Sequence, residues 1–92
     1  MAQTVTLAVG TATDDGADVI IPQGGRTTIG IYAGAGTKLD SMALAYLYQR
    51  TPGAENLICE LTSSQASLLI EGPNTVFVRR VVALVPFGAF AE

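Results

Sequence analysis

Hydrophobic and polar side chains alternate in short runs along most of this chain, and turn-forming residues separate the runs. The clearest run is Thr4 to Val9, in which Val5, Leu7 and Val9 alternate with polar or small residues. Alternation with a period of two is typical of a strand with one buried face, because successive side chains of a strand point to opposite sides. We therefore expect a strand here whose three larger apolar side chains share one face.

Further runs follow the same pattern. Short segments rich in β-branched and aromatic residues predict strands at 19–21, 26–33, 55–61, 66–70, 75–82 and 87–91. Between them lie segments that cannot continue a ladder, among them a polar loop at 10–18, Pro22 to Gly25, and Glu71-Gly72-Pro73-Asn74. In the run 75–82, Val76, Val78 and Arg80 fall on one side, and Phe77, Arg79 and Val81 on the other.

The segment Leu39 to Arg50 fits two periods. Leu39, Met42, Ala43, Tyr46 and Leu47 recur at helical spacing, whereas Met42, Leu44, Tyr46 and Tyr48 alternate as in a strand. Asp40 could cap the helix. The β propensity of Tyr46-Leu47-Tyr48 favours the strand, and Thr51-Pro52-Gly53-Ala54 suits a hairpin turn into the next run. We expect the strand and keep the helix as the alternative.

These elements predict an all-β fold, a single small β-sandwich or jelly-roll-like domain of about seven or eight antiparallel strands. Helices and strands do not alternate, which excludes a doubly wound parallel sheet. The length of 92 residues suits one domain, 1–92. We expect residues 1–9 to serve as an N-terminal arm or as a strand added to a neighbour, because exposed alternating ends readily do so.

The composition indicates that part of the surface is covered by neighbours. Hydrophobic residues make up 49% of the chain and charged residues only 14%, against about 25% in an ordinary soluble domain. Exposed apolar patches commonly mark interaction sites. We therefore expect a homo-oligomer or copies bound in a larger assembly, with a monomer merely rich in alanine and glycine as the alternative.

The residue types needed for most catalysis are absent. The chain has no His and one Cys, so neither a Cys/His zinc site nor a Ser-His-Asp or Cys-His arrangement can form. The acidic residues lie mostly in turns, where we expect solvated charge, and the spacing of Asp14, Asp15 and Asp18 matches no calcium loop. We expect no enzyme activity, no cofactor and no metal. Cys59 is expected to be a buried structural thiol.

Nucleic acid and membrane are also unexpected partners. The net charge is −3 and the five basic residues are scattered, so no basic face follows a phosphate backbone. The longest apolar stretch, 81–87, holds seven residues, far short of the roughly 20 that a spanning helix needs. The N-terminus lacks the basic and apolar regions of a signal peptide, so we expect a chain made and used in soluble form.

Arg79-Arg80 is the charged feature that stands out. Adjacent residues of a strand point to opposite faces, so one arginine should lie along solvent or a partner and the other should need a carboxylate or carbonyl acceptor. Either the arginine stems cover an open sheet face, or a guanidinium grips a carboxylate across an interface. Arg26 and Arg50 are weaker candidates of the same kind, and the three tyrosines are expected at core or edge positions.

Two stretches carry a resemblance to a known family. Val19 to Ile29 is a strand, a Pro/Gly turn and a second strand, and Leu61 to Arg80 contains Gly72-Pro73-Asn74-Thr75 before a strand ending in arginine, followed by Pro86-Phe87-Gly88. Over residues 19–90 the chain resembles the small β-sandwich virion proteins of tailed bacteriophages, of the head decoration or cement type. It departs from them at Asn74, where glycine is common, and at Leu57-Ile58-Cys59, where many relatives have an aromatic strand with tryptophan.

The resemblance implies a non-enzymatic structural protein on the capsid exterior, made in the host cytoplasm, that binds the major capsid protein or other virion proteins and stabilises the head. The residues expected to contact the partner are Arg26, Gly72, Pro73, Asn74, Arg79 and Arg80. An alternative is a tail-fibre or head-fibre module that binds a host receptor or glycan, which exposed aromatic residues would favour.

Overall fold

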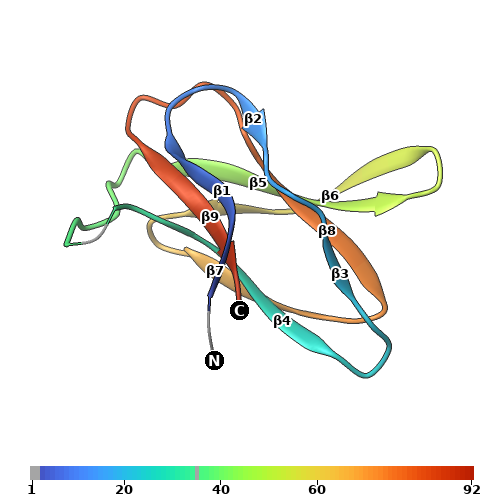
Figure 1. The fold of residues 1–92 in the computed structure, drawn as a ribbon. Coiled ribbons are helices and arrows are strands. Elements are labelled where there is room, and N and C mark those ends of the chain that lie inside the picture. The colour runs from blue at the N-terminus through green and yellow to red at the C-terminus, as the bar shows by residue number, and fades with distance from the viewer. Residues whose placement is uncertain (1–2, 35) are drawn as a thin grey trace.

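The computed structural model describes residues 3–34 and 36–92, and in these residues the chain forms nine strands and no helix (Figure 1). The strands are β1 (Thr4–Gly10), β2 (Asp14–Asp15), β3 (Val19–Ile21), β4 (Arg26–Tyr32), β5 (Leu44–Thr51), β6 (Ala54–Thr62), β7 (Ser67–Glu71), β8 (Asn74–Arg80) and β9 (Phe87–Ala91). They pair antiparallel in a four-stranded and a five-stranded sheet. The predicted all-β sandwich is confirmed.

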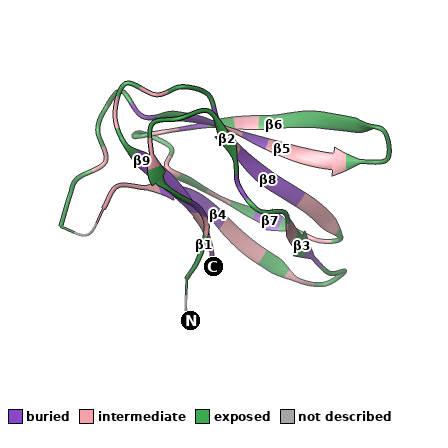
Figure 2. Ribbon diagram, turned by 45° about the horizontal axis from the view of Figure 1, so that its top comes forward, coloured by how far each residue is buried: buried purple, intermediate pink, exposed green. Residues whose placement is uncertain are grey.

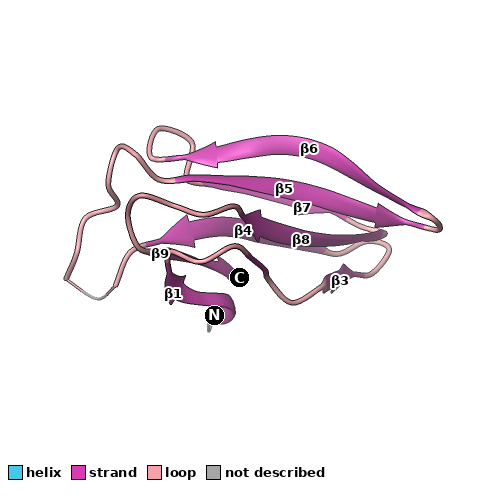
Figure 3. Ribbon diagram, turned by 90° about the horizontal axis from the view of Figure 1, so that it is seen from above, coloured by secondary structure: helices cyan, strands magenta, loops and turns pink. Residues whose placement is uncertain are grey.

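The chain passes repeatedly from one sheet to the other. The four-stranded sheet has the order β1-β9-β4-β7, and the five-stranded sheet has the order β2-β8-β5-β6 with β3 also paired to β8. Figure 3 shows the strands of the two layers from above. Among the described strands, β5 and β6 are the one pair of sequence neighbours that also pair in a sheet. Their hairpin projects from the side of the sandwich (Figure 1).

The core fills the space between the inner faces of the two sheets. The four-stranded sheet contributes Leu7, Ile29, Ile31, Ile70, Phe87 and Ala89, and the five-stranded sheet contributes Ile21, Ala45, Leu47, Leu61, Val76 and Val78. The predicted alternation in β8 is confirmed, since Val76 and Val78 join the core and Phe77 lies outside this cluster. Burial of these apolar side chains is the main stabilising contribution in a domain of this kind.

The ambiguous segment 39–50 is a turn followed by a strand. Asp40 accepts a hydrogen bond at 2.8 Å from the backbone N–H of Met42, so its carboxylate closes a turn and caps no helix. Strand β5 then pairs with β6 on one side and β8 on the other, which buries Ala45 and Leu47. The hairpin turn at Thr51–Ala54 is as predicted, and Gly53 supplies its positive φ of 75°.

The prediction that Val5, Leu7 and Val9 share one buried face is wrong. Leu7 is buried, but Val5 and Val9 are exposed. The pairing of β1 with β9 shifts register between Val5 and Leu7 and again between Leu7 and Gly10. Such bulges change which face a side chain takes. Of the segment 1–9 expected as an arm or added strand, residues 4–9 belong to β1 in the domain's own sheet, and residues 1 and 2 lie outside the described part.

Two predicted boundaries also change around β8. Asp14–Asp15, expected within a loop, forms β2 and pairs with Arg79 and Arg80. Strand β8 ends at Arg80, so Val81 and Val82, predicted to continue it, begin a loop. The backbone N–H groups there bond to the 11–13 segment, with Val82 N donating to Thr13 Oγ1 at 2.9 Å and Ala83 N donating to the Thr11 carbonyl at 2.8 Å. These bonds turn the chain out of the sheet.

Candidate interaction surface

The loop between β8 and β9 is built only from apolar residues. We call Val81-Val82-Ala83-Leu84-Val85-Pro86 the apolar loop. Val82 is 73% exposed and Leu84 80% exposed. Loops normally lie on the surface and carry polar residues, so six consecutive apolar residues here are unusual. Exposed apolar groups gathered in this way mark sites where another surface can dock.

The apolar loop has hollows beside it. Its first part and the neighbouring Met42 and Leu44 line a shallow depression of about 220 Å³, and Met42 is itself 57% exposed. Its last part lines a second depression of about 350 Å³, whose other residues are Val9, Ala33, Gly34, Thr37, Lys38 and Asp40. We call the apolar loop with Met42 and Leu44 the apolar end of the sandwich. This surface combines a projecting loop with concave flanks.

The side chain of Arg80 holds the two ends of the apolar loop together. Its side chain is buried, with 4% exposed, and it donates hydrogen bonds to three backbone carbonyls. Nε bonds to the Ala12 carbonyl at 2.7 Å, and Nη1 bonds to the carbonyls of Ala8, at 2.9 Å, and Phe87. Arg80 and Phe87 are the residues at the two ends of the loop, so a single side chain fixes its base. Because the two ends of the loop are already held, the loop loses less conformational entropy when a partner binds.

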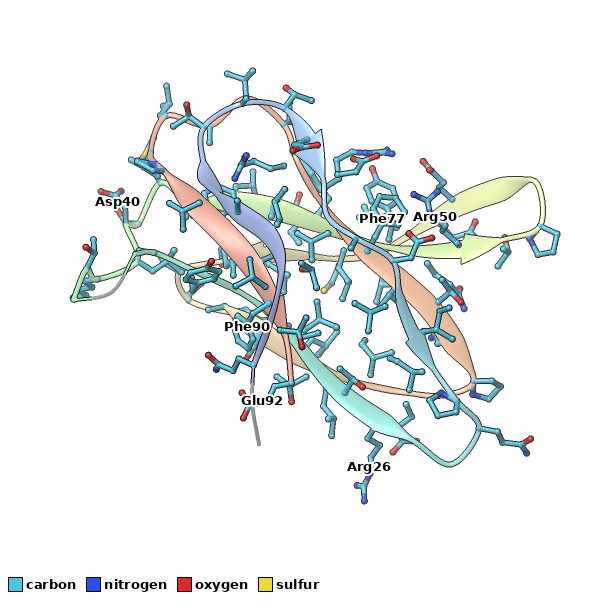
Figure 4. All side chains as sticks on the ribbon, viewed as in Figure 1. Arg26, Asp40, Arg50, Phe77, Phe90 and Glu92 are labelled. Atoms are coloured by element: carbon cyan, nitrogen blue, oxygen red, sulfur yellow. The ribbon has the colours of Figure 1, made fainter. Side chains whose placement is uncertain are left out.

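The outer face of the five-stranded sheet carries a layer of aromatic rings and guanidinium groups. Phe77 is buried there because Tyr48 stacks on it with ring centroids 5.6 Å apart and the Arg50 guanidinium lies 4.0 Å from its centroid. Figure 4 shows Phe77 and Arg50 side by side. The Arg79 guanidinium lies 4.8 Å from the centroid of Tyr48. These cation–π contacts shield the rings from solvent on a face that no other sheet covers in the described structure.

Carboxylates form ion pairs with the guanidinium groups of the same layer. Arg79 pairs with Asp15 at 2.8 Å and Glu55 at 2.9 Å, and Arg50 pairs with Asp18 at 2.7 Å and Glu55 at 2.8 Å. The hydrogen bond from Arg79 lowers the pKa of Asp15, and the bonds from Asp15 and Glu55 raise the pKa of Arg79. Solvated charge was the expectation for these acids, and Asp15, Asp18 and Glu55 are indeed exposed, but each is also paired with an arginine, which was not expected. The predicted hairpin turn at 51–54 is a signal for the pairing of Arg50 with Glu55, whereas Asp15 and Asp18 lie too far from their arginines in sequence for a local pattern to pair them.

The six residues expected to contact a partner lie in different places. Arg26 is exposed and pairs in register with Glu71, and the adjacent turn Gly72-Pro73-Asn74 packs on the β3–β4 turn through a 2.9 Å bond from Gly72 N to the Gly25 carbonyl. Asn74 Oδ1 accepts a bond from Gln49 Nε2 at 2.9 Å. Arg79 and Arg80 lie at the opposite end of β8, about 20 Å away along the strand. The six residues therefore form no single surface.

The tyrosines and Cys59 occupy intermediate positions. Tyr32, Tyr46 and Tyr48 are half-buried, and Tyr32 meets Phe90 edge to face with ring centroids 6.3 Å apart. Cys59, expected to be buried, is half-buried on β6, where burial raises the pKa of its thiol. The apolar end was missed as a site. The apolar run 81–87 could have indicated this site, but its first two residues were predicted to belong to the strand 75–82.

Neither the grouping of side chains in the described residues nor the comparison with known proteins narrows the range of functions further. In residues 3–34 and 36–92, no three His, Cys, Asp or Glu side chains are grouped so as to hold a metal ion. None of the segments that the structure describes forms a helix able to cross a bilayer. The chain matches no protein-family model, no curated protein and no solved structure. The fold places the chain in the structural class of two-sheet antiparallel β-sandwiches. The proposal for its function rests on the exposed apolar residues at one end of this sandwich.

Proposed function

We propose that this chain is a non-enzymatic virion structural protein of the bacteriophage head decoration type, which binds the major capsid protein lattice through its apolar end and stabilises the head. The observation that carries the proposal is the apolar loop, whose Val82 and Leu84 are largely exposed and whose two ends are joined by the hydrogen bond from Arg80 to Phe87. An apolar surface that is already ordered binds at a low entropic cost.

The charge balance supports a protein partner. The chain carries a net charge of −3, and the apolar loop itself has no charged residue. An anionic lipid or nucleic-acid surface would be repelled by the net charge, and basic side chains would be needed to offset it. The resemblance of residues 19–90 to phage head decoration proteins supports the capsid lattice as the protein surface.

The test uses heads of the phage that encodes this sequence, purified after deletion of its gene. Added protein should sediment with these heads, and its copy number at saturation should match the capsid lattice. The Leu84→Asp variant should bind at least about tenfold more weakly, because it places a charge in a dry contact. Leu69→Asp is the matched control, since Leu69 is also exposed but lies on β7.

Three outcomes would contradict the proposal. The first is wild-type protein that does not bind the heads. The second is a saturating copy number of only a few per particle, which would favour a tail position. The third is equal binding by wild-type protein and the Leu84→Asp variant, which would place the contact away from the apolar end.

A further inference from the structure

Strand β6 is a long unpaired edge. It closes the five-stranded sheet on one side and runs for nine residues, Ala54–Thr62, and among the described strands it pairs with β5 alone. Apart from half-buried Cys59, every residue from Ala54 to Glu60 is exposed, as the largely green β6 in Figure 2 shows. Exposure of consecutive residues means that both faces of the strand are open. In the part of the chain that the structure describes, the N–H and C=O groups that point away from β5 have no strand beside them, and at the end of β6 the Thr62 N–H donates to the Gln65 carbonyl at 3.0 Å.

The other described edges are less suited to pairing. Strands β2 and β3 have two and three residues, β7 has five, and β1 carries two register shifts. Short strands and bulges are the devices that proteins use to keep edges from pairing. β6 contains no Pro, Lys or Arg, and its one irregularity is the shift opposite Leu47 and Tyr48. An extended strand is the partner that satisfies a row of free backbone groups.

The register with β5 defines which side chains of β6 share a face. Glu55, Leu57, Glu60 and Thr62 lie opposite Arg50, Tyr48, Tyr46 and Leu44, and therefore share the outer face. Asn56, Cys59 and Leu61 lie opposite Gln49, Leu47 and Ala45, and therefore share the inner face. Directly opposed residues of an antiparallel pair must lie on the same face.

We propose that two copies of this chain pair antiparallel through β6, about a two-fold axis between Ile58 and Cys59, and join their five-stranded sheets into one. In this register Leu57 faces Glu60 of the partner subunit, Asn56 faces Leu61 of the partner subunit, and Glu55 faces Thr62 of the partner subunit. At the axis Cys59 faces Ile58 of the partner subunit, the residue that the register shift leaves without a partner on β5. Away from the axis, the outer residues Glu55, Leu57, Glu60 and Thr62 oppose outer residues, and the inner residues Asn56 and Leu61 oppose inner ones. A shift by one residue would break this match along the whole strand.

The positions of Glu55 and Glu60 favour the same pairing register. With the axis moved to lie between Leu57 and Ile58, Glu55 would face Glu60 of the partner subunit, and like charges directly opposed are destabilising. In the proposed register neither glutamate faces another charge. The pairing goes beyond the proposed function and does not depend on it, because it is formed by the isolated protein.

The first test is a charge series at Leu57, measured by sedimentation velocity on the isolated protein. Wild-type protein should form a dimer. Leu57→Glu should weaken the dimer at least about tenfold, because it faces Glu60 of the partner subunit twice across the axis, whereas Leu57→Lys should retain it by pairing with the same carboxylate. Leu69→Glu is the matched control, since Leu57 and Leu69 are both 53% exposed. Circular dichroism confirms that the variants keep the fold.

The second test is disulfide trapping in a Cys59→Ser background. A mixture of the Leu57→Cys and Glu60→Cys proteins should form a covalent dimer under mild oxidation, whereas each protein alone should not. A mixture of Glu55→Cys and Glu60→Cys proteins reports the rejected register and should stay unlinked. The proposal is overturned by a monomer at protein concentrations up to about 1 mM, by open-ended polymers, by equal dimerisation of the Glu and Lys variants, or by linkage in the second mixture.

Discussion

Arg80 donates a hydrogen bond to the carbonyl oxygen of Phe87, so the last residue of β8 holds the first residue of β9 across the apolar loop. The same side chain reaches the carbonyls of Ala8 and Ala12, which belong to β1 and to the segment after it. One buried guanidinium therefore connects both sheets at this end of the sandwich. Among the described residues no buried side-chain nitrogen or oxygen lacks a partner, and the Nε and Nη1 groups of Arg80 are bonded to these three carbonyls.

Replacing Arg80 with Met should destabilise the fold by about 3 kcal/mol, because one buried and two part-buried hydrogen bonds to carbonyls are lost while most of the side-chain volume remains. Urea denaturation followed by circular dichroism measures the change. Arg26→Met is the control and should stay within about 0.5 kcal/mol, since Arg26 is exposed. Equal stability of the two variants would show that the Arg80 hydrogen bonds contribute nothing net.

The pair Asp15–Arg79 should make stability depend on pH. Because the folded-state pKa of Asp15 lies below its ordinary value of 3.8, the pair stabilises the fold above that pH and the contribution is lost as pH falls through the lowered pKa. The difference in Tm between wild type and Asp15→Asn should therefore shrink from about pH 5 to about pH 2. Asp14→Asn removes the neighbouring carboxylate without removing an ion pair, and its difference should not follow this course.

Gly30 is required where strand β4 passes under Phe90. A Cβ at this position would lie 2.6 Å from the Phe90 ring and 2.9 Å from the Ala66 carbonyl oxygen, and the backbone atom cannot move aside. Gly30→Ala should cost about 1–3 kcal/mol through overpacking. Gly34→Ala, where a Cβ would meet nothing within 4 Å, should be nearly neutral. Thermal unfolding compares the two, and a neutral Gly30→Ala would mean that the ring and strand separate easily.

Phe77 should behave as a core residue although it lies on the outer face of its sheet. Its ring is buried beneath Tyr48 and Arg50, so Phe77→Ala should destabilise the fold by about 3 kcal/mol. Phe90→Ala, on the outer face of the other sheet and only half-buried, should cost clearly less. Chemical denaturation of both variants checks the order, and the reverse order would contradict the account of the ring and guanidinium layer.

The local pattern predicted the strands well and the surface poorly. The alternation in 75–80 identified the core residues Val76 and Val78, because a regular strand preserves the period. It failed at Val5, where a bulge in β1 changes the face, and at Val81, where hydrogen bonds to the 11–13 segment end the strand. Both effects depend on partners distant in sequence. The adjacent arginines were expected to differ in environment, and Arg80 with three carbonyls and Arg79 with two carboxylates do so.

The adjacency of Thr4 and Ala91 has a practical consequence. These residues are paired between β1 and β9, and Gln3 Nε2 donates to Glu92 Oε2 at 2.9 Å, so both ends of the described chain emerge together (Figure 1). Since β9 begins at the apolar loop and runs away from it, a fluorescent label or displayed peptide joined next to Gln3 or Glu92 would lie at the end of the sandwich opposite the apolar loop. A short linker across this end would also allow a circular permutant opened at the β5–β6 tip.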